Sequence, residues 1–436
     1  MKFEKDLYVI DALYQSFLKN YWSNKNVHAI HFNHASITPP LPFIHQAAFK
    51  IQQENLSIDS EKRLRIIERT RHKVGRLLNL KEECVAFANN TTDATSLVFW
   101  LIGLRKGDNV ITTDAENESI PRVFRYYMDH ANPGDGWVSW QNFAQYSNSQ
   151  TGLIKKRRTG VNVKTVKAYG VDDTKFLKNL IEEIDKSTKL VVFCHVLREN
   201  GQIMPVRRIC EVVREVDSKI FILVDGAQCL GVMPKIDFDE LGCDFYVATP
   251  HKTLCSETTG ILFMSQKHLH LCHNINNVPK EKQIIKKDQF SKKLATNPNS
   301  HFAVSLPEIY ALNLVIDYYQ RKGWLIGNDF SPVDHHLRTL KRALIARLEK
   351  LDAEIVSPIS PKFTNFICSS RFRSLDNREI VRKLWGRNIF VSYIYRSNVI
   401  RTSFSISNTL DDVDKFELAL RQILANNEVS ASSFSG

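Results

Sequence analysis

The sequence predicts an α/β fold in which a large, mostly parallel sheet carries helices on both faces and is followed by a smaller C-terminal α+β domain. From residue 83 onward, short apolar runs alternate with helix-forming segments, a pattern typical of strands joined by crossover helices. The part from about 332 to 426 instead has the order helix, strand, strand, helix, strand, strand, helix. The 436 residues, 43% of them apolar, are enough for more than one hydrophobic core.

The elements follow from apolar spacing taken in chain order. Residues 5–22 are expected to be helical, residues 41–80 to form helices, and residues 307–321 to form another. Apolar runs predict seven strands at 84–87, 109–112, 165–168, 189–194, 220–224, 244–248 and 260–264.

These elements predict how the chain divides. Residues 1–40 are expected to pack near the site and the small domain, 41–305 to form the large domain, and 306–426 the small one. The segment 131–162 is rich in Gly, Asn, Ser and Gln without periodicity, which indicates an insertion or a lid. The Ser-rich residues 427–436 are predicted to be a disordered tail.

Composition argues against several classes of protein. No window reaches the ~18 apolar residues of a membrane span, and the charged start lacks the apolar core of a signal peptide, so a cytoplasmic protein is expected. The net charge of +12 is dispersed, and its densest stretch, 280–293, contains acids and no aromatics, so we expect no nucleic-acid partner. The eight cysteines form no Cys-x-x-Cys pair, so buried free thiols and no metal site are predicted.

Two strand ends carry the strongest chemical signal. Asp225 follows the strand 220–224, and Lys252 follows the strand 244–248 after Thr249, Pro250 and His251. Open α/β sheets bind ligands at the carboxyl ends of their strands, so the carboxylate and the amine should share one crevice. A Lys there can form a Schiff base with an aldehyde cofactor, and an Asp can hold the proton on its pyridine nitrogen. This pair predicts a pyridoxal 5′-phosphate site.

Other residues suit the remaining parts of such a ligand. Thr91 and Thr92 open a helix after Asn90, where free backbone N–H groups favour a phosphate, although the same sequence is common as a simple helix cap. Gln228 lies close enough in sequence to Asp225 to bond the ring's phenolic oxygen. Arg401 is suited to bidentate capture of a carboxylate, or is a surface Arg on an edge strand.

In this order the motifs resemble the class V aminotransferase family of fold-type I pyridoxal-phosphate enzymes, a group that includes cysteine desulfurases. The resemblance runs from Asn33 to the C-terminal helix. It implies a homodimer with its sites at the interface and a cofactor bound to Lys252, with Asp225 at the ring nitrogen and Gln228 at the ring hydroxyl. The phosphate contacts that it implies are Thr91, Thr92, Thr249, His251 and Asn297 of the partner subunit, and the substrate contacts are Arg401 and Asn33.

The sequence departs from the family at three places. Asn117 occupies the place of a His that stacks on the ring, and Arg198 that of an Asn at the ring hydroxyl. Residues 392–398 lack the catalytic Cys of desulfurases. We therefore expect an enzyme acting at Cα or Cβ of an amino acid or related amine, an aminotransferase-like enzyme and not a cysteine desulfurase. An epimerase, a β-eliminating lyase and a catalytically silent binding protein on the same fold remain alternatives.

Overall fold

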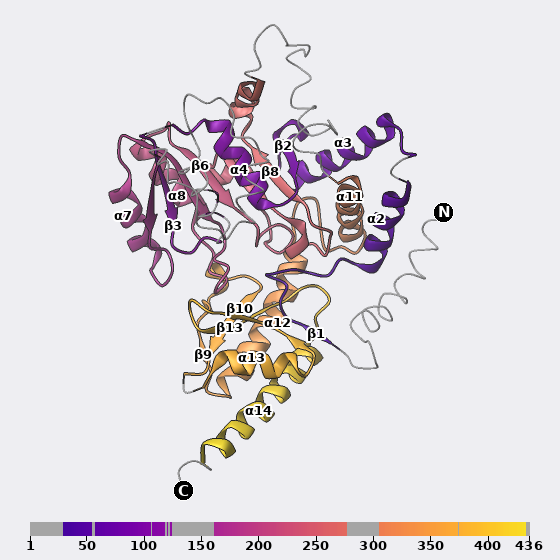
Figure 1. Ribbon diagram of the computed structural model, residues 1–436, viewed down its shortest axis with the longest axis vertical. Coiled ribbons are helices and arrows are strands. Elements are labelled where there is room, and N and C mark those ends of the chain that lie inside the picture. Colours follow the sequence, from indigo (N-terminus) through magenta and orange to yellow (C-terminus); the bar gives the residue numbers. More distant parts are fainter. Residues whose placement is uncertain are drawn as a thin grey trace, which may run out of the picture.

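The structure is a computed structural model that describes residues 29–54, 57–105, 107–117, 120, 123, 161–276, 305–373 and 375–432. Figure 1 shows the strands of a large sheet in the upper part of the molecule and a smaller sheet below them. The predicted helix 5–22 and nearly all of the predicted insertion 131–162 lie outside the described residues.

A seven-stranded sheet forms the upper region, in the order β2-β8-β7-β6-β5-β3-β4. Its strands are β2 (Val85–Ala88), β3 (Asn109–Thr113), β4 (Asn162–Val166), β5 (Thr188–Cys194), β6 (Phe221–Asp225), β7 (Phe245–Ala248) and β8 (Gly260–Met264). Neighbouring strands are parallel except that β8 runs antiparallel to both β2 and β7. The predicted mostly parallel, seven-stranded sheet is confirmed.

Alternating side chains give this sheet two buried faces. Val191 and Phe193 join one hydrophobic cluster, whereas Leu190 and Val192 join the other, because successive residues of a strand point to opposite sides. One face is covered by α4 (Thr91–Ile102) and η3 (Gln266–Asn276). Among the helices whose buried residues join the other cluster are α3 (Ser60–Leu77), α7 (Asp173–Glu183), α8 (Val206–Val216) and the single turn α9 (Phe238–Leu241).

Beyond residue 305 the chain leaves the large sheet. Helix α11 (Leu306–Arg321) packs on α2 (Pro42–Glu54) and α3, so this helix contacts the upper region. The elements that follow are α12 (Ser331–Glu349), β9 (Glu354–Ile355), η6 (Pro361–Phe363), β10 (Ile367–Arg371), α13 (Asn377–Trp385), β11 (Ile389–Phe390), β12 (Ser392–Ile394), β13 (Val399–Ser403) and α14 (Leu410–Ser432).

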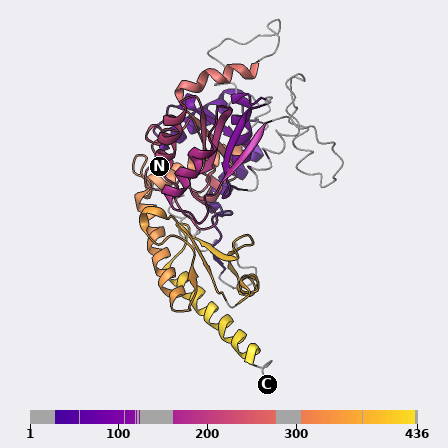
Figure 2. The ribbon, with the colours of Figure 1, turned by 90° about the vertical axis from the view of Figure 1, so that its left-hand side faces the viewer.

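The lower region is a second, antiparallel sheet with helices, as predicted for the C-terminal domain. Its order is β12-β13-β10-β9. Figure 2 shows α14 leading away from this sheet to the C-terminal end. Because α14 extends to Ser432, a helix reaches into the predicted tail 427–436. The division of the chain into domains at 40 and 305 stays a prediction.

The segment after residue 29 connects the two regions. Strand β1 (Ile30–His31) pairs in parallel with β11 of the small sheet, and Asn33 forms a bridge with Ser403. A few residues later, the backbone N–H of Thr38 donates to the carbonyl of His251, just after β7, at 2.7 Å. Among the described residues, no helix is both long and apolar enough to cross a membrane.

Candidate active site

The carboxyl ends of β5, β6 and β7 meet at one edge of the large sheet. Asp225, the last residue of β6, lies in register between Cys194 of β5 and Val247 of β7. Its carbonyl accepts from the N–H of His195 at 2.8 Å. Lys252 follows β7 in the short helix η2 (Pro250–Lys252). The two strand ends that the sequence singled out therefore lie side by side.

The backbone of Lys252 is anchored by a hydrogen bond in which its side-chain amine takes no part. The hydroxyl of Thr38 donates to the carbonyl of Lys252 at 2.6 Å. Burial lowers the pKa of the Lys252 amine, Asp225 opposes this, and the positive charges of Arg401 and Arg198 lower the pKa further. Lowering the pKa of an amine raises its neutral fraction, and the neutral amine is the form that acts as nucleophile and base.

The residues next to Asp225 are tightly packed. Burial raises the pKa of its carboxyl, while Lys252 and the N–H of Ala227, which donates at 2.9 Å, oppose this. The next residue must be Gly226, because a Cβ there would lie 2.1 Å from the ring of Tyr246. The hydroxyl of Tyr246 lies 3.0 Å from Nδ1 of His195, whose pKa burial lowers to about 4, so that this ring is neutral.

The first turn of α4 lies beside the start of β8. Asn90 caps the helix by accepting from the N–H of Asp93 at 2.9 Å, which places Thr91 and Thr92 at its first two positions. A Cβ on Gly260 would lie 2.2 Å from the Asn90 carbonyl oxygen, so only glycine permits this approach. A helix start with free N–H groups is suited to an anion.

Thr249 has other partners than the predicted phosphate. It is fully buried, and its hydroxyl donates to the carbonyl of Thr259 at 2.7 Å. Since that uses its one hydrogen, Nδ1 of His251 is the donor across the 2.6 Å contact with Thr249. Burial lowers the pKa of His251 to about 4, with a further contribution from the charge of Lys252. Thr249 thus orients His251, and a phosphate contact from either residue stays a prediction.

Arg401 of β13 is the centre of the small-domain side of the site. Nη1 donates to the carbonyl of Arg198 at 3.0 Å, and Nη2 donates to the hydroxyls of Ser36 at 2.6 Å and Ser392 at 3.2 Å. Asn33 Oδ1 also lies 3.3 Å from Nη2. Burial lowers the pKa of Arg401 to about 10, and Arg198 adds to this. Arg401 therefore lies in the interior and is not a surface residue on an edge strand.

The other predicted contacts lie around this crevice. Gln228 is buried and donates from Nε2 to the carbonyl of Ala35 at 2.8 Å. Arg198 lies in the loop after β5, and Asn117 lies just beyond the end of β3. Asn297 lies outside the described residues, so the predicted contribution of the partner subunit stays a prediction.

Glu116 is a site residue to which the sequence analysis gave no role. Its Oε1 accepts from the Thr113 hydroxyl at 2.6 Å and from the N–H of Cys194 at 3.0 Å. Burial raises the pKa of Glu116 to about 8, and the charge of Asp225 adds to this, so that the carboxyl is largely protonated at neutral pH. A carboxyl at a strand end on the same edge as Asp225 was the signal that could have identified it.

The residues fit pyridoxal 5′-phosphate. Within the described part of the chain, Gln228 Oε1, Arg198 Nε, Arg401 Nε and Glu116 Oε2 are buried polar atoms without hydrogen-bond partners. Buried polar groups are rarely left unpaired, so these atoms indicate a polar ligand. Lys252, the carboxylate of Asp225 and the α4 start add an amine, a partner for a pyridinium nitrogen and an anion site. No three His, Cys, Asp or Glu residues of the described ranges form a metal-binding group.

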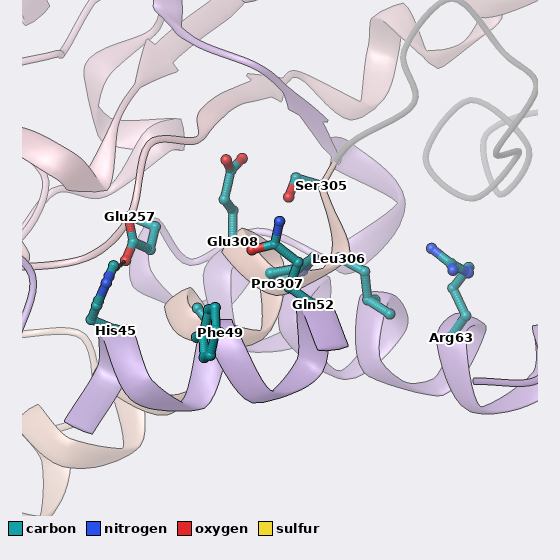
Figure 3. A pocket seen from close by; sticks show the side chains of 10 residues that line it. His45, Phe49, Gln52, Arg63, Glu257, Ser305, Leu306, Pro307 and Glu308 are labelled. Carbon is teal, nitrogen blue, oxygen red and sulfur yellow. Dashed lines mark hydrogen bonds and ion pairs between the residues drawn. The ribbon is translucent and has the colours of Figure 1, made fainter. Parts of the chain in front are cut away.

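A separate cavity of about 350 Å³ lies between α2 and the start of α11 (Figure 3). His45 contacts Glu257 at 2.8 Å on one side of it, and burial raises the pKa of Glu308 to about 7. None of the predicted site residues lines this cavity.

Comparisons with known proteins identify relatives of this chain. The family model for aminotransferase class-V matches residues 146–416. A probable cysteine desulfurase of Borreliella burgdorferi is 24% identical over 82% of this chain and 81% of its own length. Another, of Halalkalibacterium halodurans, is 30% identical over 46% of this chain and spans 43% of that relative. A solved complex of the cystine C–S lyase C-DES with cysteine persulfide has a TM-score of 0.71 at 19% identity and covers 90% of this chain and 97% of its own, a likeness of fold.

These relatives correct the predicted activity. The expectation of an aminotransferase-like enzyme that is not a cysteine desulfurase is wrong, because relatives matched across most of the chain are named as probable cysteine desulfurases. That expectation rested on the missing Cys in residues 392–398. The presence or absence of one Cys in that hairpin was therefore too narrow a criterion.

Proposed function

This chain belongs to the aminotransferase class-V family, and from that premise we propose that it removes sulfur from cysteine or a cysteine-derived amino acid by breaking the Cβ–S bond. Its cofactor is pyridoxal 5′-phosphate. The observation that carries the proposal is the alignment with a relative named as a probable cysteine desulfurase over 82% of the chain. The convergence of Lys252, Asp225 and Arg401 supports the same chemistry.

Lys252 and Asp225 have complementary proposed roles. When bound, the cofactor supplies an electron sink that weakens the bonds at the substrate's Cα. Asp225 holds a proton on the ring nitrogen through its negative charge. The lowered pKa of Lys252 suits its amine to take the proton from Cα and to return it.

Arg401 is the proposed anchor of the substrate's α-carboxylate. Its guanidinium is buried and is oriented by Ser36, Ser392 and the carbonyl of Arg198, which are all neutral groups and form no ion pair with it. A carboxylate bound there is fixed relative to Lys252, which is how a site converts binding into alignment of the reacting bond. Asn33, which lies against Arg401, is proposed to contact the same end of the substrate.

We propose that a thiol from solution accepts the sulfur. All seven cysteines whose side chains the structure describes are buried, and burial raises the pKa of each thiol. Protonated, inaccessible thiols are poor nucleophiles. Cysteine and an external thiol would then give alanine and the persulfide of that thiol.

The finer features of the assembly also belong to this proposal. A homodimer would bring Asn297 of the partner subunit to the phosphate end of the site, near Thr91 and Thr92. Light scattering on the purified protein should give twice the mass of the chain, and a stable monomer with full activity would contradict it. The cytoplasmic location inferred from the charged N-terminal sequence stays a prediction.

Replacement of Lys252 tests the proposed function. Wild-type protein incubated with the cofactor should gain visible absorption and release alanine and sulfide from cysteine in the presence of dithiothreitol. Lys252→Ala should lose the covalently bound cofactor and at least ~10³-fold of the activity, because base and attachment point are the same amine. The matched control is Lys219→Ala, an exposed Lys beyond α8. If the coloured wild-type protein leaves both cysteine and S-carboxymethyl-L-cysteine unchanged, the proposed reaction is rejected.

A further inference from the structure

Arg401 and Arg198 are neighbours in the crevice, and their positive charges interact without a carboxylate paired to either of them within the described residues. Arg401 is only 4% exposed and donates to the backbone carbonyl of Arg198, which fixes the two residues next to each other. Within the described part of the chain, neither guanidinium has a carboxylate within 4.0 Å, and Nε of each is buried without a hydrogen-bond partner.

The loop that carries Arg198 is fixed on both sides. Val196 pairs with Ile203 across the loop, and Gly201 closes it by donating to the Leu197 carbonyl at 2.8 Å. The carbonyl of Glu199 accepts from the Ser369 hydroxyl of β10, which ties the loop to the small sheet. Its position is therefore set by the fold. A positive side chain placed by a rigid loop suits a fixed anionic partner.

The charges of this crevice are unbalanced at Arg198. Its charge lowers the pKa of both Arg401 and Lys252, so the three cations repel one another. The charge of Asp225 raises the pKa of Lys252, and the charge of Glu199 raises the pKa of Arg401. Within the described residues, neither acid forms an ion pair with Arg198. One α-carboxylate would satisfy Arg401. Arg198 would still lack a partner beside it.

We propose that Arg198 binds a second anionic group of the substrate, so that the preferred ligand is an amino acid whose side chain ends in a carboxylate or a similar acid. The inference rests on the proposed function, because the ligand is taken to be an amino acid held by Arg401. It names the substrate class: a cysteine derivative with an acid beyond its sulfur. It also replaces the role at the cofactor's ring oxygen that the sequence suggested for Arg198.

Binding to the holoenzyme tests this without turnover. The probes are two acid–amide pairs, L-aspartate with L-asparagine and S-carboxymethyl-L-cysteine with its amide, titrated against the cofactor's visible absorption. Each acid should bind the wild type about 10-fold or more tightly than its amide, which is the scale of one charge-assisted hydrogen-bonded pair. Arg198→Gln should bring this ratio close to one, and Arg401→Gln should weaken both members of a pair.

The controls separate the alternatives. Arg207→Gln, an exposed Arg on α8, should keep the wild-type ratio. If Arg198→Gln leaves the acid–amide ratio intact but shifts the absorption of the bound cofactor, Arg198 serves the cofactor and the inference is wrong. A wild-type ratio near one overturns it as well, whether or not the variants fold, and Arg198→Lys provides a milder second variant. A high ratio without cleavage of the Cβ–S bond of cysteine or of S-carboxymethyl-L-cysteine would reject the proposed function and leave this inference standing.

Discussion

At the scale of single residues, Glu116 shows how the fold keeps two acids on one strand edge. Asp225 is proposed to act as an anion, yet a second carboxyl lies close enough for their charges to interact. Protonation of Glu116, favoured by burial, removes that repulsion and leaves one negative charge. The role is one of positioning, since Glu116 also holds the N–H of Cys194 beside Asp225.

Glu116 should make stability fall with rising pH. Its pKa is about 8 in the folded protein against an ordinary 4.5, so the folded state retains a proton that the unfolded chain loses. The contribution is fully present below pH 4.5 and is lost as the pH rises through 8, by roughly 3–5 kcal/mol. Chemical denaturation from pH 4 to 9 measures it.

Glu116→Gln should flatten this pH dependence, because the amide cannot ionise and can still accept from Thr113. Glu182→Gln, at an exposed position of α7, is the control that should keep the wild-type slope. Equal slopes in wild type and Glu116→Gln would show that the buried carboxyl does not titrate in this range.

Residues differ in how far the sequence could predict them. Lys252 and Asp225 were predictable because each ends an apolar strand, and Arg401 because it lies within one. Ser36 and Ser392, which orient Arg401, had no such signal, because they meet only through the paths of segments far apart in the chain. Thr249 was assigned to the phosphate from its place near Lys252, and the bond to Thr259 became visible only in three dimensions.

At the scale of elements, the contact between the cap of α4 and the first residue of β8 sets the shape of the phosphate end. Gly260 brings the two backbones together because it has no Cβ. Hydrophobic alternation predicted both elements. It carries no information on how closely a helix cap approaches a strand, which depends on the absence of a single carbon atom.

Gly260→Ala should therefore damage both stability and cofactor binding. The added Cβ would lie 2.2 Å from the Asn90 carbonyl oxygen, a backbone atom that cannot swing away. We expect a loss of about 3 kcal/mol, the upper range for overpacking, and weaker retention of the cofactor through displacement of the α4 start. Thermal unfolding and equilibrium dialysis measure the two effects.

Gly386→Ala is the matched control for that variant. Gly386 ends α13 with φ −61°, and its nearest contact to an added Cβ is an ordinary 3.5 Å. It should be neutral or slightly stabilising. If the Gly260→Ala protein is as stable as the Gly386→Ala protein, the backbone of Asn90 can move away from the added Cβ at little cost in free energy.

At the scale of the whole molecule, the site lies where both sheets and the segment after residue 29 meet. The fold class and nearly every strand of the large sheet were predictable, because the spacing of apolar residues is visible in the local sequence. The parallel pairing of β1 with β11 was not, since a two-residue strand has no period to read. Sequence reasoning also erred on the activity, where it took the absence of one side chain for the absence of a reaction.

Removal of the cofactor should destabilise the whole protein. Without a bound anion, Lys252, Arg198 and Arg401 repel one another across the two regions. Pyridoxal 5′-phosphate at 100-fold over its dissociation constant should add about 2.7 kcal/mol to the free energy of unfolding. Pyridoxal at the same concentration should add less, because it lacks the phosphate. Thermal unfolding of stripped and reconstituted protein measures this. Identical melting with either compound would show that the α4 start contributes no phosphate binding.

The contacts of residues 33–38 have a consequence for how the protein is made. Arg401 and Ser36 are separated by 365 positions, and Ser403 and Ala35 by 368. A nascent chain leaving the ribosome exposes its cofactor crevice, between Thr91 and Lys252, long before Arg401 has been translated. The cofactor end of the site can therefore assemble during synthesis, whereas the anion-binding end can form only after the last strand emerges. Contacts of such high sequence separation form slowly, so we expect the anion-binding end of the site to form late in folding.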